Sequence, residues 1–589
     1  MLNTLTFGSF VGATALVAIL TYLIVRRMGR SDNPTEEFFT GGRMLSWPIV
    51  AGSLLLTNIS TEQLVGLNAA VFKDGNLVGI AWEAMAAFAM IATAILFLPK
   101  YLASGFTTST AFLEKRFDKG TRLLVSGLFL LGYVTVLLPS ILYTGSLAFK
   151  TMFQLDTPLW IIVALIGLLG SGYAIFGGLK AVAVSDTING VGLLIGGLAI
   201  PTLALIALGD GSMSVGLNTL LEQSPQSLTP LATLDRRGGE VSVPWPTLLT
   251  GMMFIQVFYW STNQVIVQRA MGAKSLAEGQ KGVLFASLMK LVGPLMLCLP
   301  GIIALHMLGQ LQVTLDLSLL SEKLANPAPA VPPEVISYGQ ELLKLKPNLI
   351  FLGDAERLHA LGISFNDQIY PAIVNKVLPS WSLGLFAAVL MGSILSSFNS
   401  ALNSASTLFC LEFYEDRVPE DAFESQGARA AHIVLVGQRF GIALAIISMV
   451  IAPMLDQLKS IFEYLQKANG LYSVPIISIF LVGILSKRAP ALGAKIAMAL
   501  GMITYGFFTF VGIDGLHWLH GYAMSFAVAV GALMITSVTQ PRTNAEIASG
   551  DELPPPPVDM TPWAHAKTAS ILIFALTCAI YVGLFLIAQ

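Results

Sequence analysis

Residues 56–63 read LTNISTEQ, and they lie in the middle of an otherwise apolar stretch that covers residues 44–72. An unbroken helix that faces lipid does not carry such a run of polar side chains at its centre. A discontinuous membrane helix does, because its freed backbone carbonyls line a cavity in which polar groups are satisfied. The stretch therefore predicts a membrane helix that is broken near its midpoint, and with it an all-α membrane fold around a polar centre.

The composition of the whole chain agrees with this prediction. Of its 589 residues, 54% are hydrophobic and only 12% are charged, and the mean hydropathy is +0.73. A soluble protein has roughly a quarter of its residues charged, so we expect lipid bilayer to cover most of the surface. The net charge of -2 gives no electrostatic case for binding nucleic acid.

Apolar stretches long enough to cross a bilayer recur along the chain. One crossing needs about 20 apolar residues in a helix. We therefore expect about fourteen transmembrane helices, at residues 7–26, 44–72, 76–103, 121–153, 158–177, 180–209, 246–272, 279–308, 381–411, 434–455, 457–487, 490–513, 517–539 and 565–588.

Lysine and arginine are concentrated in the loops after the first, third, seventh and eleventh expected helices. Positively charged loops stay in the cytoplasm, so we expect both termini on the external side. Residues 210–245 would then form an external loop, residues 309–380 an external lid of short helices, and residues 541–564 a cytoplasmic linker. No cleavable signal is evident and the loops are compact, which favours the plasma (inner) membrane of a bacterial-type cell.

Three ionisable residues lie inside expected membrane helices: Glu83, Asp186 and Lys290. An ionisable group at such a depth is costly unless it is paired or lines a cavity, so each is a functional candidate. At about 1.5 Å per residue, Glu83, Lys290 and Gln466 lie roughly 10–13 Å from the ends of their helices, near mid-membrane. Asp186 lies nearer the cytoplasm, together with the serine-rich stretch 393–406. We expect two polar layers at these two depths.

The stretch 393–406 reads SILSSFNSALNSAS. Its hydroxyls, together with the carbonyls of the broken helix, are hard oxygen ligands that suit Na⁺, and the sequence has no histidine–cysteine cluster for softer metals. A single serine in a membrane helix is more often a small packing residue, and Gln256 or Gln466 alone often serves only as interhelical glue. Taken with the broken helix and Asp186, the serine run favours a sodium site.

Several short motifs recur in an order that is specific to one family. They are EFFTGGR (37–43), NISTEQ (58–63), FGGLKA (176–181), YW (259–260), QR (268–269), AKS (273–275), QKG (280–282) and SSFNSALNS (396–404). In these motifs the chain resembles the solute:sodium symporter family, and within it the sodium/glucose (galactose) cotransporter branch. The resemblance covers nearly the whole chain.

The resemblance implies a LeuT-like fold, in which two inverted repeats of five helices form a core. One extra helix would precede the core (1–30). The first repeat would cover 44–209, the external loop 210–245 and the second repeat 246–487. Three further helices would follow at 488–589.

The resemblance also implies the substrate and gate residues. Sugar hydroxyls would be held by Gln63, Glu83, Gln256, Lys290 and Gln466, a set that coincides with the mid-membrane layer. Tyr259, followed by Trp260 in the YW motif, would stack on the sugar from the inner side. The outer gate would consist of Leu67, Trp82 and Phe462.

The implied sodium ligands are the carbonyls of Leu56, Ile59 and Ser393 and the hydroxyls of Ser396 and Ser397. Asp186 corresponds to an acidic residue on the sodium exit path. Some relatives hold a second sodium with that aspartate and with hydroxyls at the positions of Asn399 and Ser400. The asparagine departs from this pattern, as do Gln256 and Ala86 in the sugar site, so the second sodium and the identity of the sugar stay open.

The expected function is sodium-coupled import of a hexose or related polyol by alternating access, with Na⁺ as coupling ion and no other cofactor. The alternatives are a sodium symporter of another solute (an amino acid, carboxylate or vitamin), a membrane sensor or a channel. No phosphate loop, catalytic triad or redox motif is present, so we do not expect an enzyme.

Overall fold

The structure, a computed structural model, describes residues 4–28, 34–153, 155–235, 238–315, 317–327, 331–345, 347, 349–457, 461–543 and 556–589. Nearly all of it is helical. The helices and strands are α1 (Thr4–Arg27), α2 (Pro34–Thr40), α3 (Trp47–Asn58), α4 (Thr61–Asp74), α5 (Ala81–Ala92), α6 (Leu98–Ser104), α7 (Ala111–Arg116), α8 (Lys119–Gly132), α9 (Leu138–Met152), α10 (Leu159–Leu208), α11 (Met213–Gln223), α12 (Met253–Ser261), α13 (Gln264–Met271), α14 (Leu276–Lys290), α15 (Gly293–Leu297), α16 (Leu299–His306), β1 (Gln312–Thr314), α17 (Leu317–Ala325), α18 (Pro333–Leu345), β2 (Leu349–Phe351), α19 (Ala355–Ala360), α20 (Ile369–Val377), α21 (Ser380–Leu408), α22 (Gln426–Ile451), α23 (Ile461–Leu485), α24 (Ala491–Gly506), α25 (His520–Thr539) and α27 (Ala566–Ile587).

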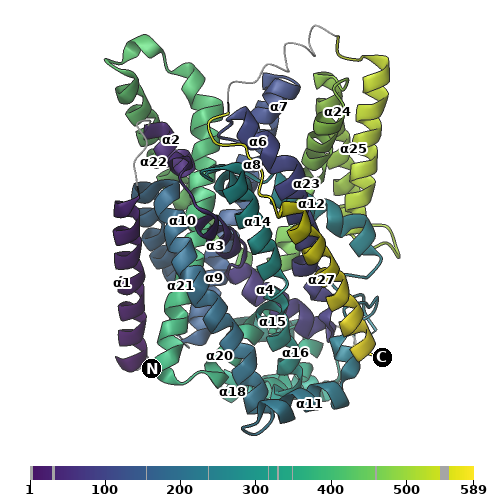
Figure 1. The fold of residues 1–589 in the computed structure, drawn as a ribbon. Helices are drawn as coiled ribbons and strands as arrows, with labels where there is room; N and C mark the ends of the chain where they lie inside the picture. The colour runs from purple at the N-terminus through teal and green to yellow at the C-terminus, as the bar shows by residue number, and fades with distance from the viewer. Residues whose placement is uncertain are drawn as a thin grey trace.

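The helices stand side by side in a bundle, and both chain termini lie at the same end of it (Figure 1). Ten described helices, several of them continued by short π or 3-10 segments, are long and apolar enough to cross a membrane. The number is eleven if α14 and the bent α15–α16 segment count as one span. The predominantly helical, multi-pass class is therefore confirmed. The expected helices at 44–72, 158–177 and 246–272 fall on broken or shorter helices, so the number fourteen stays a prediction.

Besides the bent α14–α16 run, two apolar helices of the described part are broken around polar residues at their centres. The first has α3 and α4 on either side of Ile59 and Ser60, as the polar run LTNISTEQ predicts. The second has α12 and α13 on either side of Thr262 and Asn263. Both breaks lie in the interior of the bundle, where other helices can satisfy the freed backbone groups.

α10 replaces two expected helices with one helical element of 50 residues, in which the side chains of residues 172–178 lie outside the described part. Its two halves nevertheless pack on the same part of α21, because Gly170 meets Leu395 and Gly192 meets Val389. In a straight helix Gly170 and Gly192 would be about 33 Å apart, whereas their partners on α21 are separated by about 9 Å. The halves therefore lie side by side, as two membrane spans do.

The expected external segments contain more regular structure than the sequence indicates. Residues 210–245, expected as a loop, include the helix α11. The expected lid at 309–380 contains short helices and also a two-stranded antiparallel sheet, in which β1 pairs with β2 with Val313 opposite Ile350. In Figure 1 α11 and α18 lie at the same end of the bundle as the termini. Half of the expected linker 541–564 (residues 544–555) lies outside the described residues.

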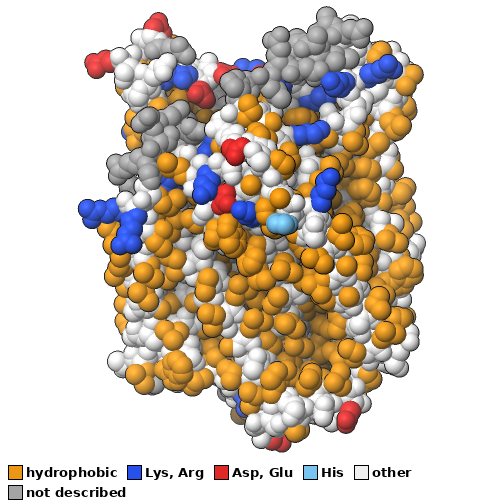
Figure 2. Space-filling model, in the orientation of Figure 1, with side chains coloured by type: hydrophobic (Ala, Val, Ile, Leu, Met, Phe, Trp, Pro, Cys, Tyr) orange, Lys and Arg blue, Asp and Glu red, His pale blue; other side chains and the backbone are white. Residues whose placement is uncertain are grey.

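The surface has the two zones that a bilayer requires. Figure 2 shows lysine and arginine side chains gathered over the end opposite the termini, and a broad hydrophobic zone over the rest of this face. Large apolar side chains are fully displayed on the outside, for example Leu249 (80% exposed) and Val538 (82% exposed). Such a surface is stable only in contact with lipid.

Candidate functional site

The first break is held by side chains from two other helices. Ile59 and Ser60 have non-helical backbone angles, so carbonyls around the break lack partners within the helix. Ser393 Oγ of α21 donates a hydrogen bond to the Ile59 carbonyl at 2.9 Å. Lys290 Nζ of α14 donates to the side-chain oxygen of Asn58. The break is thus tied to α14 and α21.

The second break is held in a similar way. The side-chain oxygen of Asn263 accepts a hydrogen bond from the Val265 backbone N–H at 3.2 Å, which caps α13. The same oxygen accepts a bond from the Tyr133 hydroxyl at 2.6 Å. Asn58 and Asn263 both line one central cavity, so the two breaks meet there.

The central cavity is polar and small. Its volume of about 60 Å³ is room for a few water molecules rather than for a sugar. Its lining consists of Asn58, Glu62, Gln63, Trp82, Tyr133, Leu137, Ile255, Gln256, Phe258, Tyr259, Asn263, Phe462, Leu465, Gln466, Asn469 and Tyr472. In this conformation side chains fill the space that a solute would need.

The structure gathers part of the predicted substrate set around this cavity. Gln63, Gln256, Tyr259 and Gln466 line it, and Gln256 also donates to the Trp82 carbonyl at 2.7 Å. The remaining members are buried next to the lining rather than in it: Glu83, Lys290 and Trp260.

Glu83 and Lys290 form an ion pair that is completely buried, with 1% of each side chain exposed. Lys290 Nζ also lies 5.5 Å from the centroid of the Trp260 ring, a cation–π contact. Because Lys290 donates to Asn58, which faces the cavity, the pair is one side chain away from it. A buried pair of this kind is stable only when both partners are present.

A wider cavity, which we call the vestibule, adjoins the central cavity on the side of the lid. It measures about 610 Å³, and its lining includes Lys73, Glu240, His359, Asp367, Lys467 and Trp518. Burial raises the pKa of the Asp367 carboxyl to about 7. The vestibule thus carries a carboxyl group that titrates near neutral pH.

Trp82 and Phe462 separate the vestibule from the central cavity, because they line both. Their rings meet edge to face, with centroids 5.3 Å apart. Phe462 rests on Gly66, where an added β-carbon would come within 2.7 Å of it. Leu67, the third residue expected in the outer gate, is fully buried beside Gly66 and lines neither cavity.

The expected sodium ligands converge where α21 passes the first break. Ser397 Oγ donates a hydrogen bond to the Thr57 carbonyl at 3.4 Å. Ser393 donates its hydroxyl to the Ile59 carbonyl, whereas the backbone carbonyl of Ser393, which is the expected ligand, lies inside helix α21. Leu56 and Ser396 are buried at the same place. Carbonyl and hydroxyl oxygens together are the donor set that a hard monovalent cation needs.

Asp186 lies beside this cluster and has a positive partner that the sequence did not reveal. The guanidinium of Arg269, fully buried, is 3.8 Å from an Asp186 oxygen and donates to the hydroxyl of Ser400. Ser53 Oγ donates to the same Asp186 oxygen at 2.8 Å. Asn399 is buried nearby, and neither polar atom of its side chain has a hydrogen-bond partner among the described residues. A fixed positive charge thus stands between Asp186 and Ser400.

Several cavity residues are absent from the predicted site: Asn58, Glu62, Tyr133, Asn263, Asn469 and Tyr472. Four of them carry a signal in the sequence: Asn58 and Glu62 belong to the polar run LTNISTEQ, and Asn469 and Tyr472 follow Gln466 at intervals of three residues on α23 and share its face. Tyr133 begins the π-helical segment η4 (Tyr133–Leu137), a feature common at functional sites. That π segment is not visible in the sequence.

Comparison with known proteins adds independent findings. A family model described as "Sodium:solute symporter family" matches residues 38–332 and 334–501. The chain is 36% identical over 593 residues to the "Uncharacterized symporter YidK" of Escherichia coli (strain K12), which covers 99% of this chain and 91% of that protein. It is 30% identical over 472 residues to the "Sodium/glucose cotransporter" of Vibrio parahaemolyticus, which covers 80% of this chain and 78% of the relative.

A solved structure shares the fold. It is the substrate-bound outward-open state of a Na⁺-coupled sialic acid symporter, which matches with a TM-score of 0.68 and 19% identity over 92% of this chain and 98% of its own. At this level of identity the match concerns the arrangement of the helices alone. It confirms the expected LeuT-like class of fold.

Proposed function

Because this chain belongs to the sodium:solute symporter family and is a sodium-coupled transporter, we propose that the solute it imports is a sugar, a hexose or a related polyol. The observation that carries the proposal is the Glu83–Lys290 pair set behind a ring of amide side chains. A sugar offers many hydroxyls, and each of them both donates and accepts hydrogen bonds. Amides and a neutralised ion pair can satisfy both kinds of bond.

The relative named as a sodium/glucose cotransporter supports this choice of solute. The proposed roles follow the implied residues: Gln63, Gln256 and Gln466 bind hydroxyls directly, and Tyr259 closes the inner side, with Trp260 behind it. Glu83 and Lys290 reach the sugar when Asn58 moves as the cavity expands.

The proposed coupling step uses the first break. A Na⁺ ion bound by the Ile59 carbonyl and the hydroxyls of Ser396 and Ser397 would join the broken helix to α21. Sugar then binds, Trp82 and Phe462 close over it, and the sodium leaves past Asp186. One positive charge moving through 100 mV supplies about 2.3 kcal/mol, which corresponds to about fiftyfold accumulation of solute.

We propose further that one sodium moves per cycle. The Arg269 guanidinium lies between Asp186 and Ser400, two of the residues that a second sodium would need. Two positive charges at such a distance in a buried site repel strongly. A second sodium would therefore have to displace the arginine.

A second candidate solute is an amino acid or another amine. Glu62 faces the central cavity, is buried, and has one carboxylate oxygen without a hydrogen-bond partner among the described residues. An ammonium group would satisfy that oxygen. The fold and the sodium site would be the same in this case.

Uptake into proteoliposomes tests these proposals together. Labelled hexoses, polyols and amino acids are offered with an inward Na⁺ or K⁺ gradient, and we expect Na⁺-dependent accumulation of a sugar with a Hill coefficient for sodium near 1. Ser397→Ala removes one proposed ligand and should raise the sodium concentration for half-maximal uptake about tenfold or more. Ser382→Ala, a half-buried serine at the start of the same helix, is the matched control.

Each result has a clear meaning. Accumulation of amines alone would replace the sugar proposal by the Glu62 alternative. A Hill coefficient near 2 would contradict the role given to Arg269. An unchanged sodium dependence in Ser397→Ala would remove this serine from the site.

We also propose the arrangement of repeats given above, with residues 44–209 and 246–487 as the inverted pair. The two central breaks support it, since each lies in the first helix of its repeat. In the plasma membrane, the end rich in lysine and arginine would face the cytoplasm and both termini the outside.

A further inference from the structure

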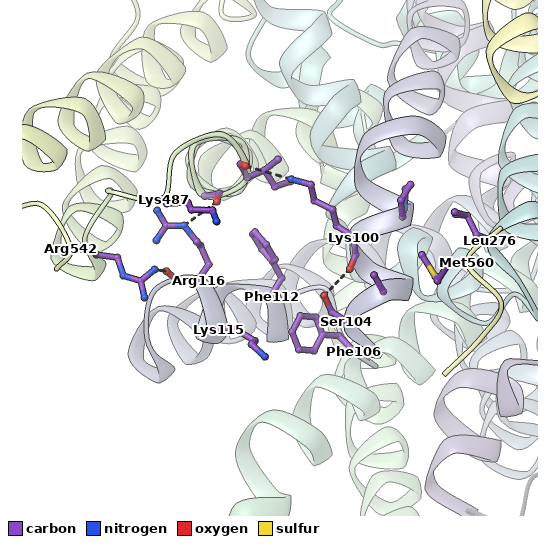
Figure 3. A pocket seen from close by; sticks show the side chains of 14 residues that line it. Lys100, Ser104, Phe106, Phe112, Lys115, Arg116, Leu276, Lys487, Arg542 and Met560 are labelled. Carbon is purple, nitrogen blue, oxygen red and sulfur yellow. Dashed lines mark hydrogen bonds between the residues drawn. The ribbon is translucent and has the colours of Figure 1, made fainter. Parts of the chain in front are cut away.

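A third cavity lies far from the solute path, and we call it the basic cavity. Its volume is about 560 Å³, and it shares no lining residue with the central cavity or the vestibule. Figure 3 shows it between α6, α7, the end of α23 and the segments that carry Arg542 and Met560. It thus collects parts of the chain that are hundreds of residues apart.

The lining has a strong excess of positive charge. It contains five basic residues, Lys100, Lys115, Arg116, Lys487 and Arg542, and no aspartate or glutamate among the described residues that line it. In Figure 3 Lys100 approaches from one side, and Arg116, Lys487 and Arg542 lie on the other. A cavity lined by several basic side chains attracts an anion.

The two arginines are fixed in place by the backbone. Arg116 donates to the carbonyls of Gly483 and Ala489, each at 3.0 Å. Arg542 donates to the Arg116 carbonyl at 2.9 Å. Their charges are therefore positioned in advance, which lowers the entropy cost of binding a ligand.

Apart from Ser104, the rest of the lining is apolar, and large apolar side chains are exposed beside it. Phe106, Phe112 and Ile484 belong to the cavity. Next to it Leu96 and Leu485 are 54% and 81% exposed on the surface that faces lipid. A ligand that fits both parts has an anionic group and an apolar body, and it reaches the cavity from the bilayer.

We propose that the basic cavity binds the phosphate of an anionic phospholipid. Basic pockets between membrane helices on the cytoplasmic side recognise such headgroups. A soluble phosphate ester offers the same anionic group but makes no use of the phenylalanines or of the opening to lipid. The proposal does not depend on the identity of the transported solute.

The position of the cavity links the lipid to the transport path. The helix run Leu77–Ser104 ends at the cavity and carries Trp82, and α23 also ends there and carries Phe462. A phosphate that bridges Lys100 and Lys487 ties together the far ends of the two helices that form the outer gate. Anionic lipid then stabilises one relative position of these helices.

Native mass spectrometry of the purified full chain tests the proposal. The protein is titrated with phosphatidylglycerol, with zwitterionic phosphatidylcholine, and with soluble glycerol phosphate. The test variant is Lys100→Gln/Lys487→Gln, which removes two exposed charges; a glutamine at position 100 can still donate to the Ile484 carbonyl, which lies 3.4 Å from Lys100 Nζ. The control is Arg26→Gln/Arg27→Gln, which removes two exposed charges at the end of α1. Thermal unfolding without added lipid checks that both variants are folded.

We expect one phosphatidylglycerol to bind to the wild type and to the control with similar affinity, and at least about tenfold more weakly to the test variant. Phosphatidylglycerol should raise the Tm of the wild type but not that of the test variant. Equal weakening in test and control would mean general surface attraction and would overturn the proposal. Glycerol phosphate binding as tightly as phosphatidylglycerol would overturn the lipid as its source.

Discussion

At the level of single residues, the buried pair of Glu83 and Lys290 is the feature with the largest consequence for stability. Two charges with 1% exposure depend on each other, because either one alone would be an uncompensated charge in the interior. The pair is also joined to the first break through Asn58. Its integrity therefore concerns the fold as well as the site.

We predict that Lys290→Met lowers the free energy of unfolding by about 3–5 kcal/mol, and that Glu83→Gln/Lys290→Met restores most of the loss. The reason is that the double variant leaves no buried charge unpaired. Thermal unfolding in detergent, followed by tryptophan fluorescence, measures the stability of each variant in this double-mutant cycle. Additive losses in the double variant would show that the two side chains do not interact.

The sequence predicted the polar residues at mid-membrane well, because an ionisable or amide side chain in a membrane helix is rare and needs a reason. It could not show that Gln63 and Gln466 line the cavity whereas Glu83 and Lys290 lie behind it. Nor did it pair Arg269 with Asp186. Which side chain lines the cavity depends on the rotation of each helix about its own axis, and the amino-acid sequence pattern does not determine that rotation.

At the level of elements, the first break was visible in the sequence because polar residues stand where lipid would exclude them. The sheet of β1 and β2 and the helix α11 were not. Three-residue strands carry too short a pattern to be recognised.

The proposed gate of Trp82 and Phe462 gives a prediction at the level of elements. Phe462→Ala removes an aromatic contact worth about 1 kcal/mol, which shifts the gate towards its open form about fivefold. A cysteine at Gln63, in a Cys578→Ser background, should then react with an external maleimide about five times faster.

Phe526→Ala is the control for this experiment, since Phe526 stacks on Phe254 away from the gate. An equal acceleration in both variants would indicate general loosening. An unchanged rate in Phe462→Ala would mean that these rings do not limit access.

The lid supplies a prediction about pH. The pKa of Asp367 is raised to about 7 by burial, so the folded protein holds this proton more tightly than the unfolded chain does. The stability that Asp367 contributes is therefore lost as pH rises from about 4 to about 7, and no further change follows above that range. We expect Asp367→Asn to raise the Tm at pH 8 and to flatten its decline between pH 5 and pH 8.

Asp514→Asn, at an exposed position outside the membrane helices, serves as the control and should leave the profile as it is. A steeper decline of the Tm with pH in Asp367→Asn would show that Asp367 does not hold the proton whose loss destabilises the fold.

At the level of the whole molecule, the asymmetry of charge between its two ends predicts its orientation. Lysine and arginine gather at the end opposite the termini (Figure 2), so that end should face the cytoplasm. In a Cys578→Ser background, an impermeant maleimide on intact cells should label Gln589→Cys and Lys344→Cys but not Arg27→Cys. Labelling of Arg27→Cys alone would invert the topology.

The central cavity of about 60 Å³ has a consequence for how affinity should be interpreted. A protein whose binding-competent form is only a fraction of the population shows an apparent Kd equal to the intrinsic Kd divided by that fraction. If the expanded form were about one molecule in a hundred, every solute would bind about a hundredfold more weakly than its contacts allow. The ratio of the affinities for two solutes would not change, because both depend on the same opening step. Selectivity would then reflect the chemistry of the cavity lining. Absolute affinity would reflect the fraction of the protein that adopts the expanded form.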